Sequence, residues 1–381
     1  MSERWDIFCR VVDNYGDVGV SWRLARQVAR EHGKRVRLWL DDLTVMAKLR
    51  PEVDPARDVQ TLEQVEIARI RSPFEAEVAD VVVETFGTDP PDAYVQAMAA
   101  RAVKPRWISL EYLSAEEWVE GSHALPSPHP RLPLVKHFFF PGFTRKTGGV
   151  LREESLLRRR DEFQADAGAQ AAFWRSLVGT TPPQEALKVS LFNYSGAPVE
   201  GLARASVQHP GPLWLVAPEG VAATALENWR LNAKARDSIN AFAVPFLAQD
   251  RYDQLLWACD VNFVRGEDSF VRAQWAGRPF AWHIYPQDDG AHWVKLSAFL
   301  ARYTAGLDRS HAAAVTSLWE AWNRRDSSPS QDASKPGLAE AWSGFTGRLE
   351  VLRPHALAWS AGLARRRDLA AEIVDFVDNL L

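Results

Sequence analysis

The sequence is poor in sulfur and has no long apolar run. Among 381 residues there are 2 cysteines and 3 methionines. Two thiols, Cys9 and Cys259, cannot build a disulfide framework or a cysteine-rich zinc site, and apolar neighbours predict that both are buried and reduced. No apolar stretch approaches the roughly 18 residues that a membrane-spanning helix needs. Residues 1–6 carry no secretory signal, so we expect a cytoplasmic protein without a membrane partner.

A large excess of positive or of negative charge is also missing. Lys and Arg number 45 against 49 Asp and Glu, a formal net charge of -4. A general nucleic-acid binder needs a basic surface, so no nucleic-acid partner is expected. With 46% hydrophobic and 25% charged residues, the composition is that of a soluble globular protein. A chain of this length exceeds one ordinary core, which favours two domains.

The most informative stretch spans residues 260–287. It begins with a buried strand over 261–264, continues through a polar segment at 265–269 into an amphipathic helix ending at Gly277, and returns as a strand over 279–284. Its polar segment therefore follows the carboxyl end of a strand, where α/β sheets bind ligands. We expect Asp268 and Ser269 to cap the helix and Arg265 to add a permanently charged fork, which together suit a nucleotide's phosphates. Alternatively, Arg265 and Asp268 form an internal ion pair and Ser269 is a plain cap.

The N-terminal half has a second polar segment after its first strand. A strand over 5–12 leads into a loop over 13–19 and a helix over 20–32, and further strands are expected at 35–40, 65–70, 80–84 and 107–110. This alternation predicts a parallel sheet. The loop holds Asp13 and Asp17 beside Gly16 and Gly19, and two carboxylates there could activate a nucleophile. Alternatively, Asp17 caps the helix and Asp13 ties the turn. The G-x-G-x-x-G dinucleotide pattern is absent.

The C-terminal half repeats the pattern with aromatic residues at strand ends. Strands are expected at 187–192, 213–216 and 241–246, with a helix over 252–258. Phe192 and Tyr194 lie at the end of the first strand, and Phe246 and Gln249 follow the third. An aromatic ring for a base and an amide for its edge would make a nucleotide pocket. Packing in the core is the alternative for each ring.

Three segments have plainer interpretations. Four prolines predict that residues 123–149 form a loop that packs aromatic side chains. The basic run at 158–160 is either a solvated helix face or an electrostatic contact for a partner. One long helix is expected over 356–381.

The histidines form no metal-ligand pattern, and no metal is expected.

Two motifs resemble the EarP family of protein-arginine rhamnosyltransferases. They are D-N-Y-G-D-V-G-V-S-W-R-L-A-R at 13–26 and N-F-V-R-G-E-D-S-F-V-R-A-Q-W at 262–275. Shorter similarities at 190–192 and 245–247 extend the resemblance over nearly the whole chain. It implies a GT-B glycosyltransferase that moves L-rhamnose from dTDP-β-L-rhamnose to an arginine of translation elongation factor P (EF-P), inverting the anomeric centre without a metal or other cofactor.

The resemblance also implies an organisation into four parts. Residues 1–150 would be a Rossmann-like acceptor-binding domain and 151–183 a helical connection. Residues 184–355 would be a Rossmann-like nucleotide-sugar-binding domain facing the first across a cleft. The C-terminal helix over 356–381 would pack toward the N-terminal domain.

Roles for individual residues follow from the same resemblance. Asp13 and Asp17 would be the acidic pair at the acceptor arginine, with Asp17 the favoured general base, and Glu267 would lie close to the reaction centre. The implied substrate-binding residues are Asn14, Tyr15, Gly16, Gly19, Phe192, Tyr194, Phe246, Gln249, Arg265, Gly266, Asp268 and Ser269.

Within that set, the donor would be divided among several elements. Phe246 would stack on thymine and Gln249 would bond its edge, while Arg265, Asp268 and Ser269 would hold the pyrophosphate. Two other functions stay open: a GT-B transferase with a different donor or acceptor, and a non-catalytic docking protein on the same fold. The retained acids argue against the second.

Overall fold

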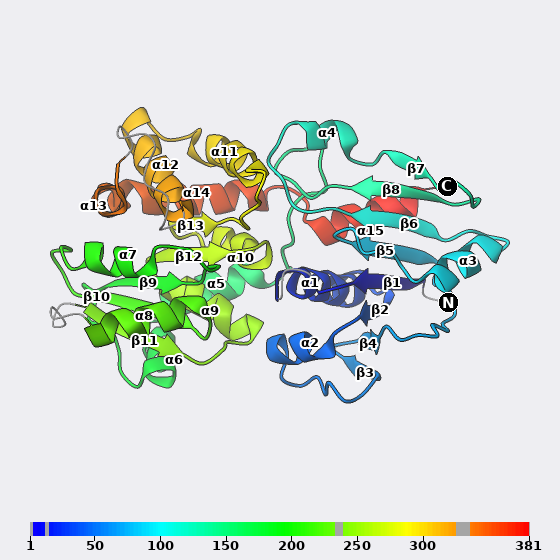
Figure 1. The fold of residues 1–381 in the computed structure, drawn as a ribbon, viewed down its shortest axis with the longest axis horizontal. Helices are drawn as coiled ribbons and strands as arrows, with labels where there is room; N and C mark the ends of the chain where they lie inside the picture. The colour runs from blue at the N-terminus through cyan, green and yellow to red at the C-terminus, as the bar shows by residue number, and fades with distance from the viewer. Residues whose placement is uncertain (1–2, 12–14, 233–238, 325–335, 381) are drawn as a thin grey trace. The chain divides into compact units, whose positions relative to one another are not determined.

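A computed structural model describes residues 3–11, 15–232, 239–324 and 336–380. The chain forms two compact units, one made of residues 1–154 and 363–381 and the other of residues 155–362. Helices α5 (Leu156–Ala165) and α6 (Ala167–Val178) therefore belong to the second unit, although we expected a separate connection over 151–183. Figure 1 shows both units with their elements labelled.

The first unit is built on a mostly parallel sheet with strand order β3-β4-β2-β1-β5-β6-β8-β7. Pairings β3–β4 and β7–β8 are antiparallel and the others are parallel. The predicted parallel sheet is confirmed. Its strands are β1 (Arg4–Cys9), β2 (Arg35–Leu40), β3 (Val59–Leu62), β4 (Val65–Arg69), β5 (Val81–Thr85), β6 (Arg106–Leu110), β7 (Pro126–Pro128) and β8 (Val135–Phe139).

The helices of this unit connect the strands and cover the sheet (Figure 1). They are α1 (Tyr15–His32), α2 (Leu43–Leu49), α3 (Asp92–Ala100), α4 (Trp118–Ser122) and α15 (Leu369–Asn379). A cluster of buried aromatic residues on one face of the sheet includes Phe8, Trp39, Tyr94 and Trp107. Each buried ring removes about 150–250 Å² from water, so this cluster is a main source of the unit's stability.

The second unit has a fully parallel sheet with strand order β11-β10-β9-β12-β13. Its strands are β9 (Leu187–Leu191), β10 (Leu213–Pro218), β11 (Ile239–Val244), β12 (Val261–Arg265) and β13 (Phe280–His283). After α5 and α6, its helices are α7 (Val199–Ser206), α8 (Val221–Asn232), α9 (Gln249–Ala258), α10 (Asp268–Ala276), α11 (Ala291–Thr304), α12 (Arg309–Asn323), α13 (Leu338–Thr346) and α14 (Leu349–Ala364). The β-α-β unit predicted for 260–287 is confirmed as β12, α10 and β13.

Two predictions about the chain's course are wrong. The segment 123–149 is not a loop throughout, because β8 pairs in parallel with β6 and β7 pairs with β8 at the sheet edge. Prolines are tolerated in an edge strand, where some N–H groups have no partner to lose. The helix expected over 356–381 is two helices, since Asp368 has extended backbone angles and its side chain accepts a hydrogen bond from the Ala371 N–H, so that α15 starts anew.

Candidate functional site

In the second unit, two predicted residues meet where the strand order reverses. The chain leaves β9 for β10 and β11 on one side and returns to β12 on the other, so the switch point lies between β9 and β12. Ligands of open α/β sheets bind outside the carboxyl ends of the strands at this point. Phe192 follows β9 directly and donates its N–H to the carbonyl of Phe263 (2.9 Å), while Arg265 is the last residue of β12.

Arg265 is held against two aromatic rings. Its Cζ atom lies 4.5 Å from the ring centroid of Phe192 and 4.7 Å from that of Tyr194. Each such contact contributes about 0.5–2 kcal/mol, depending on how far water is excluded. A guanidinium that contacts rings through its face keeps its in-plane N–H donors for a planar or tetrahedral anion. The pair of rings therefore orients a permanent positive charge at the switch point.

The start of α10 differs from the prediction. The helix begins at Asp268 after an N-cap residue, Glu267, and this N-cap makes no side-chain capping hydrogen bond. The Ser269 hydroxyl accepts a hydrogen bond from the Arg265 N–H (3.1 Å) and donates one to the Arg265 carbonyl. Capping by Asp268 and Ser269 was therefore the wrong expectation. Ser269 instead fixes the backbone that carries the Arg265 side chain.

Gly266 makes the sharp turn between β12 and α10. Its φ of 56° lies in the left-handed region, where a side chain would be strained. Its carbonyl accepts a hydrogen bond from the Trp282 indole (2.8 Å), and that indole stacks on Phe270 with ring centroids 4.0 Å apart. The turn is thus anchored to the apolar core below it.

Gln249 and Asp268 connect the start of α9 to the start of α10. The Gln249 amide donates to the Asp268 carboxylate (3.3 Å), and Gln249 is buried. Phe246 lies half-buried in the short segment between β11 and α9. The structure therefore places all the predicted donor-binding residues of this unit at or just after the carboxyl ends of β9, β11 and β12, at one edge of the sheet.

A buried ion pair holds the two helices together below these side chains. Arg272 of α10 makes two hydrogen bonds to the carboxylate of Asp253 in α9, at 2.9 and 2.6 Å. Both side chains are almost completely buried. Because breaking such a pair leaves an uncompensated buried charge, the pair fixes the relative position of α9 and α10.

His283, at the end of β13, supports the Tyr194 side of the cluster. Its Nδ1 accepts the Tyr194 N–H (3.1 Å), so the neutral ring carries its proton on Nε2. Burial, together with the positive charge of Arg265, lowers the pKa of His283 to about 4. At neutral pH, this imidazole is therefore a hydrogen-bond acceptor without charge.

In the first unit, the equivalent switch point lies between β1 and β5. Asp17 lies in the first turn of α1, which follows β1, and Phe86 follows β5. Tyr112, which comes after β6, stacks on Phe86 with ring centroids 4.6 Å apart and donates its hydroxyl to Asp17 (3.4 Å). The structure thus assembles a carboxylate and two rings at this sheet's carboxyl edge.

Phe86 and Tyr112 are the candidate residues that sequence reasoning missed. Phe86 has a φ of 56°, which is unusual and costly for a bulky residue. This backbone places its ring against Tyr112. The available signal was an aromatic residue directly after a parallel strand, the same signal that identified Phe192.

Three predicted residues around Asp17 have a different setting from the one expected. Tyr15, Gly16 and Gly19 lie inside α1, which begins five residues earlier than the helix we predicted, so the loop expected over 13–19 is wrong from Tyr15 onward. Asp17 is 2% exposed and lies inside the helix, so it is not the capping residue of the alternative interpretation. An acid there suits the positive end of the helix dipole. Asp13 and Asn14 lie outside the described residues.

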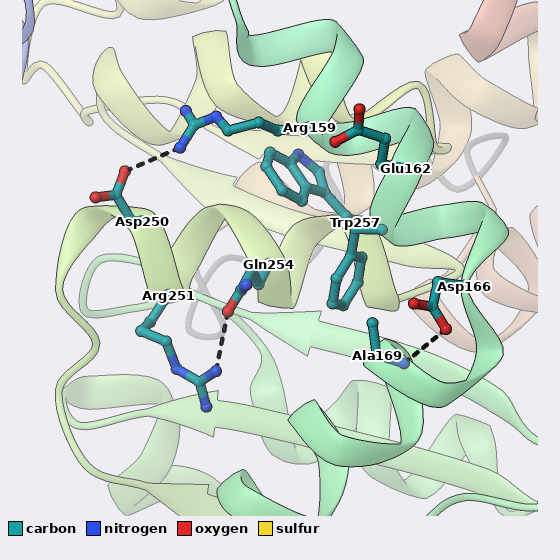
Figure 2. A pocket seen from close by; sticks show the side chains of 9 residues that line it. Arg159, Glu162, Asp166, Ala169, Asp250, Arg251, Gln254 and Trp257 are labelled. Atoms are coloured by element: carbon teal, nitrogen blue, oxygen red, sulfur yellow. Dashed lines mark hydrogen bonds and ion pairs between the residues drawn. The ribbon is translucent and has the colours of Figure 1, made fainter.

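The basic run at 158–160 is neither uniformly solvated nor uniformly available to a partner. Arg158 is exposed, whereas Arg160 is buried and donates to the Trp275 carbonyl (2.8 Å) and the Ser360 hydroxyl (3.0 Å). Arg159 pairs with Asp250 (3.7 Å) on the rim of a pocket of about 400 Å³ between α5, α6 and α9, shown in Figure 2. The predicted site residues do not line this pocket.

Within residues 3–11, 15–232, 239–324 and 336–380, there is no group of three or more His, Cys, Asp or Glu placed to hold a metal ion. No helix in those ranges is both long and apolar enough to cross a membrane.

Comparison with known proteins identifies relatives over the whole chain. A protein-arginine rhamnosyltransferase of Pseudomonas putida is 46% identical, with 100% of each chain covered. A solved structure described as the structural basis for EarP-mediated arginine glycosylation of translation elongation factor EF-P is 34% identical, with a TM-score of 0.68 and 100% of each chain covered. Acinetobacter baumannii MurG, 13% identical with a TM-score of 0.52 over 100% of each chain, shares the fold.

These neighbours have the GT-B glycosyltransferase fold, and so does this chain. The family model described as Elongation-Factor P (EF-P) rhamnosyltransferase EarP matches residues 5–378. With that match and its full-length relatives, this chain is a glycosyltransferase that belongs to the EarP family.

Proposed function

We propose that this protein transfers L-rhamnose from dTDP-β-L-rhamnose to an arginine side chain of EF-P. Family membership supports the activity class. The observation that carries the donor side is the Arg265 guanidinium held against the rings of Phe192 and Tyr194 at the switch point of the second sheet. That position suits the diphosphate of a nucleotide-sugar.

The donor would be held by groups from three strand ends. Arg265 pairs with the diphosphate, and the N–H groups at the start of α10 add partial positive charge. Phe246 stacks on thymine, and Gln249 bonds the edge of the base. The two hydrogen bonds of the Ser269 hydroxyl to the Arg265 backbone make it a positioning group as well as a neighbour of the phosphates.

The acceptor would be activated by the acids of the first unit. A free guanidinium has a pKa above about 12 and is a poor nucleophile. A carboxylate at hydrogen-bond distance localises the positive charge on some nitrogens and leaves electron density on another. Asp17, supported by Asp13, takes this role, and Tyr112 holds the Asp17 carboxylate by its hydroxyl.

The chemical step is a single displacement at the anomeric carbon. A guanidino nitrogen forms the new C–N bond from the face opposite the diphosphate. The C–O bond to the diphosphate breaks, and dTDP leaves with the electron pair. The nitrogen's proton passes to a carboxylate, for which Asp17 is the choice, while Glu267 lies near the sugar. This displacement inverts the anomeric centre.

No metal takes part in the proposed reaction. The negative charge that develops on dTDP is stabilised by Arg265 and the start of α10, where a preorganised charge costs no reorganisation. Addition of a chelator should leave the transfer rate within about twofold of the untreated rate, a difference below about 0.5 kcal/mol. Loss of activity that returns with a divalent cation would contradict this part of the proposal.

Intact-mass spectrometry tests the transfer itself. EF-P incubated with the protein and dTDP-β-L-rhamnose should gain one deoxyhexose, and an EF-P variant with lysine at the target arginine should gain none. A panel of other nucleotide-sugars separates this donor from the alternatives. If EF-P stayed unmodified with dTDP-rhamnose but was modified with another nucleotide-sugar, the proposed donor would be contradicted.

A further inference from the structure

The first unit carries a partly exposed aromatic and acidic segment that contacts Asp17 through Tyr112. Residues 111–120, E-Y-L-S-A-E-E-W-V-E, connect β6 to α4 and contain four acids and no base. Trp118 is 55% exposed and Tyr112 is 39% exposed. We call this segment the 111–120 surface.

The exposed indole of Trp118 packs against a buried ring at its base. Its ring meets the buried ring of Phe140 edge-on, with centroids 5.3 Å apart. A large side chain fixed at its base loses little conformational entropy when a partner covers it, which is the character of an interface hot spot. Singly exposed apolar residues are common, so Trp118 indicates a binding surface only together with the residues around it.

The acidic residues near Trp118 in the sequence give the 111–120 surface a negative charge. Ser114 donates its hydroxyl to the carboxylate of Glu116 (2.9 Å), which fixes the orientation of that half-buried acid two residues before Trp118. Glu117 is exposed and immediately precedes Trp118. Lys146 pairs with Glu120 (3.3 Å), so one of the four acids has its charge offset by a neighbouring base. The surface is negative overall and complements a basic segment.

The 111–120 surface is continuous with the candidate acceptor site. Tyr112 is one of its residues and also donates its hydroxyl to Asp17 (3.4 Å). A polypeptide whose arginine reaches Asp17 past Tyr112 would lay its neighbouring residues over the same segment. Arginine also favours aromatic faces and carboxylates together.

We infer that the 111–120 surface docks the basic polypeptide segment that flanks the acceptor arginine, with Trp118 as its apolar anchor. This inference rests on the proposed function for the identity of the acceptor. Trp118, Glu116 and Glu117 touch the flanking segment and not the reacting atoms. They therefore set the affinity for the protein acceptor and leave the affinity for the donor nucleotide unchanged.

Binding of EF-P in the absence of donor, measured by titration calorimetry, tests the inference separately from catalysis. Trp118→Ala should weaken EF-P binding by about tenfold or more, as expected for a hot-spot aromatic, and Trp118→Phe should recover most of the loss. The double variant Glu116→Gln, Glu117→Gln should weaken binding about threefold and flatten its dependence on salt. Binding of dTDP should stay within about twofold throughout.

Matched substitutions at the opposite side of the unit serve as controls. Val59→Ala removes an exposed apolar side chain from β3, and Glu75→Gln removes an exposed carboxylate. Both should bind EF-P like the unaltered protein. Thermal unfolding of each variant reports whether the fold is intact, and the double variant Glu116→Gln, Glu117→Gln still tests the inference if Trp118→Ala unfolds.

The outcomes separate the docking inference from the proposed function. Unaltered protein that binds EF-P through Trp118 but adds no deoxyhexose supports the docking inference and contradicts the proposed function. Unaltered protein that modifies EF-P, with neither the Trp118→Ala nor the double variant changing EF-P affinity, overturns the docking inference alone. A change in self-association with unchanged EF-P affinity would assign the surface to a second copy of the chain and also overturn it.

Discussion

The Arg265 guanidinium carbon lies 4.5 Å from the centre of the Phe192 ring, across the point where the second sheet reverses its strand order. One residue ends β12 and the other follows β9, and these strands pair in parallel although about 70 residues of chain separate them. This contact holds the positive charge of Arg265 against the aromatic ring of Phe192. Single substitutions at Arg265 therefore test the donor site.

Arg265→Lys should weaken dTDP binding by about tenfold or more. Lysine keeps the charge but loses the planar fork that contacts two rings and bonds a phosphate, a loss of about 1.5–2 kcal/mol. Isothermal titration with dTDP measures the change. Arg251 is a matched control in the same unit, because its Cζ atom lies 4.6 Å from the Phe173 ring away from the predicted site. Equal loss in Arg251→Lys would show that the effect is not specific to the switch point.

Asp17→Asn should abolish transfer to EF-P while dTDP binding survives. An amide cannot accept the guanidino proton, and removal of a general base costs about 10²–10⁴ in rate. Transfer is followed by intact mass and dTDP binding by calorimetry. Tyr112→Phe, which removes only the hydroxyl that donates to Asp17, should lower the rate by about tenfold. Near-full activity of Asp17→Asn would remove Asp17 from the proposed role.

Asp253→Asn should destabilise the second unit by about 3 kcal/mol, because it leaves the Arg272 charge buried without its carboxylate. The free energy of unfolding is measured by urea denaturation, and hydrogen exchange locates the loss in α9 and α10. The exposed i,i+4 pair of Arg204 and Glu200 is the control, and Glu200→Gln should cost less than about 1 kcal/mol. A similar cost for both substitutions would contradict the structural role given to the buried pair.

Stability should fall as the pH is lowered from about 6.5 to about 4 through His283. Burial lowers its pKa to about 4 in the folded protein, whereas the unfolded chain has the ordinary value of about 6.5. The unfolded state therefore binds one more proton in this window, and the contribution of neutral His283, complete above pH 6.5, is lost by up to about 3 kcal/mol as the pH reaches 4.

His283→Asn isolates that contribution, since the asparagine oxygen can replace Nδ1 as acceptor for the Tyr194 N–H but does not titrate. Urea denaturation at pH 7, 5.5 and 4.5 should show a flatter pH dependence for this variant than for the unaltered protein. His32→Asn, in the first unit, is the control. Identical pH dependence in the unaltered protein and His283→Asn would contradict the assignment.

Local sequence was sufficient to predict an element where the residues that stabilise it are close to it in the chain. The strand predicted at 35–40 is β2, and the β-α-β unit of 260–287 appears as predicted, because apolar periodicity and Gly277 act within a few residues. The same logic placed Phe192, Phe246 and Arg265 after strands, and parallel pairing then brings such positions to one edge.

Long-range pairing explains the predictions that failed. The prolines at 126–133 favoured a loop over the whole segment, yet β6 offers residues 135–139 a parallel partner and Phe139 becomes buried. Likewise, serine is a residue type that often caps helices, but the hydroxyl of Ser269 hydrogen-bonds to the backbone of Arg265, four residues earlier.

The sequence by itself determined the alternation of strands and helices, the two polar segments at 13–19 and 265–269, and the family to which the chain belongs. Only the tertiary structure decided that Phe86 turns its ring against Tyr112, that Tyr112 donates to Asp17, and that Arg160 is buried against the Trp275 carbonyl and the Ser360 hydroxyl. The physical reason is that side-chain partners are chosen by distance in space, and a parallel sheet brings together residues that local periodicity cannot relate.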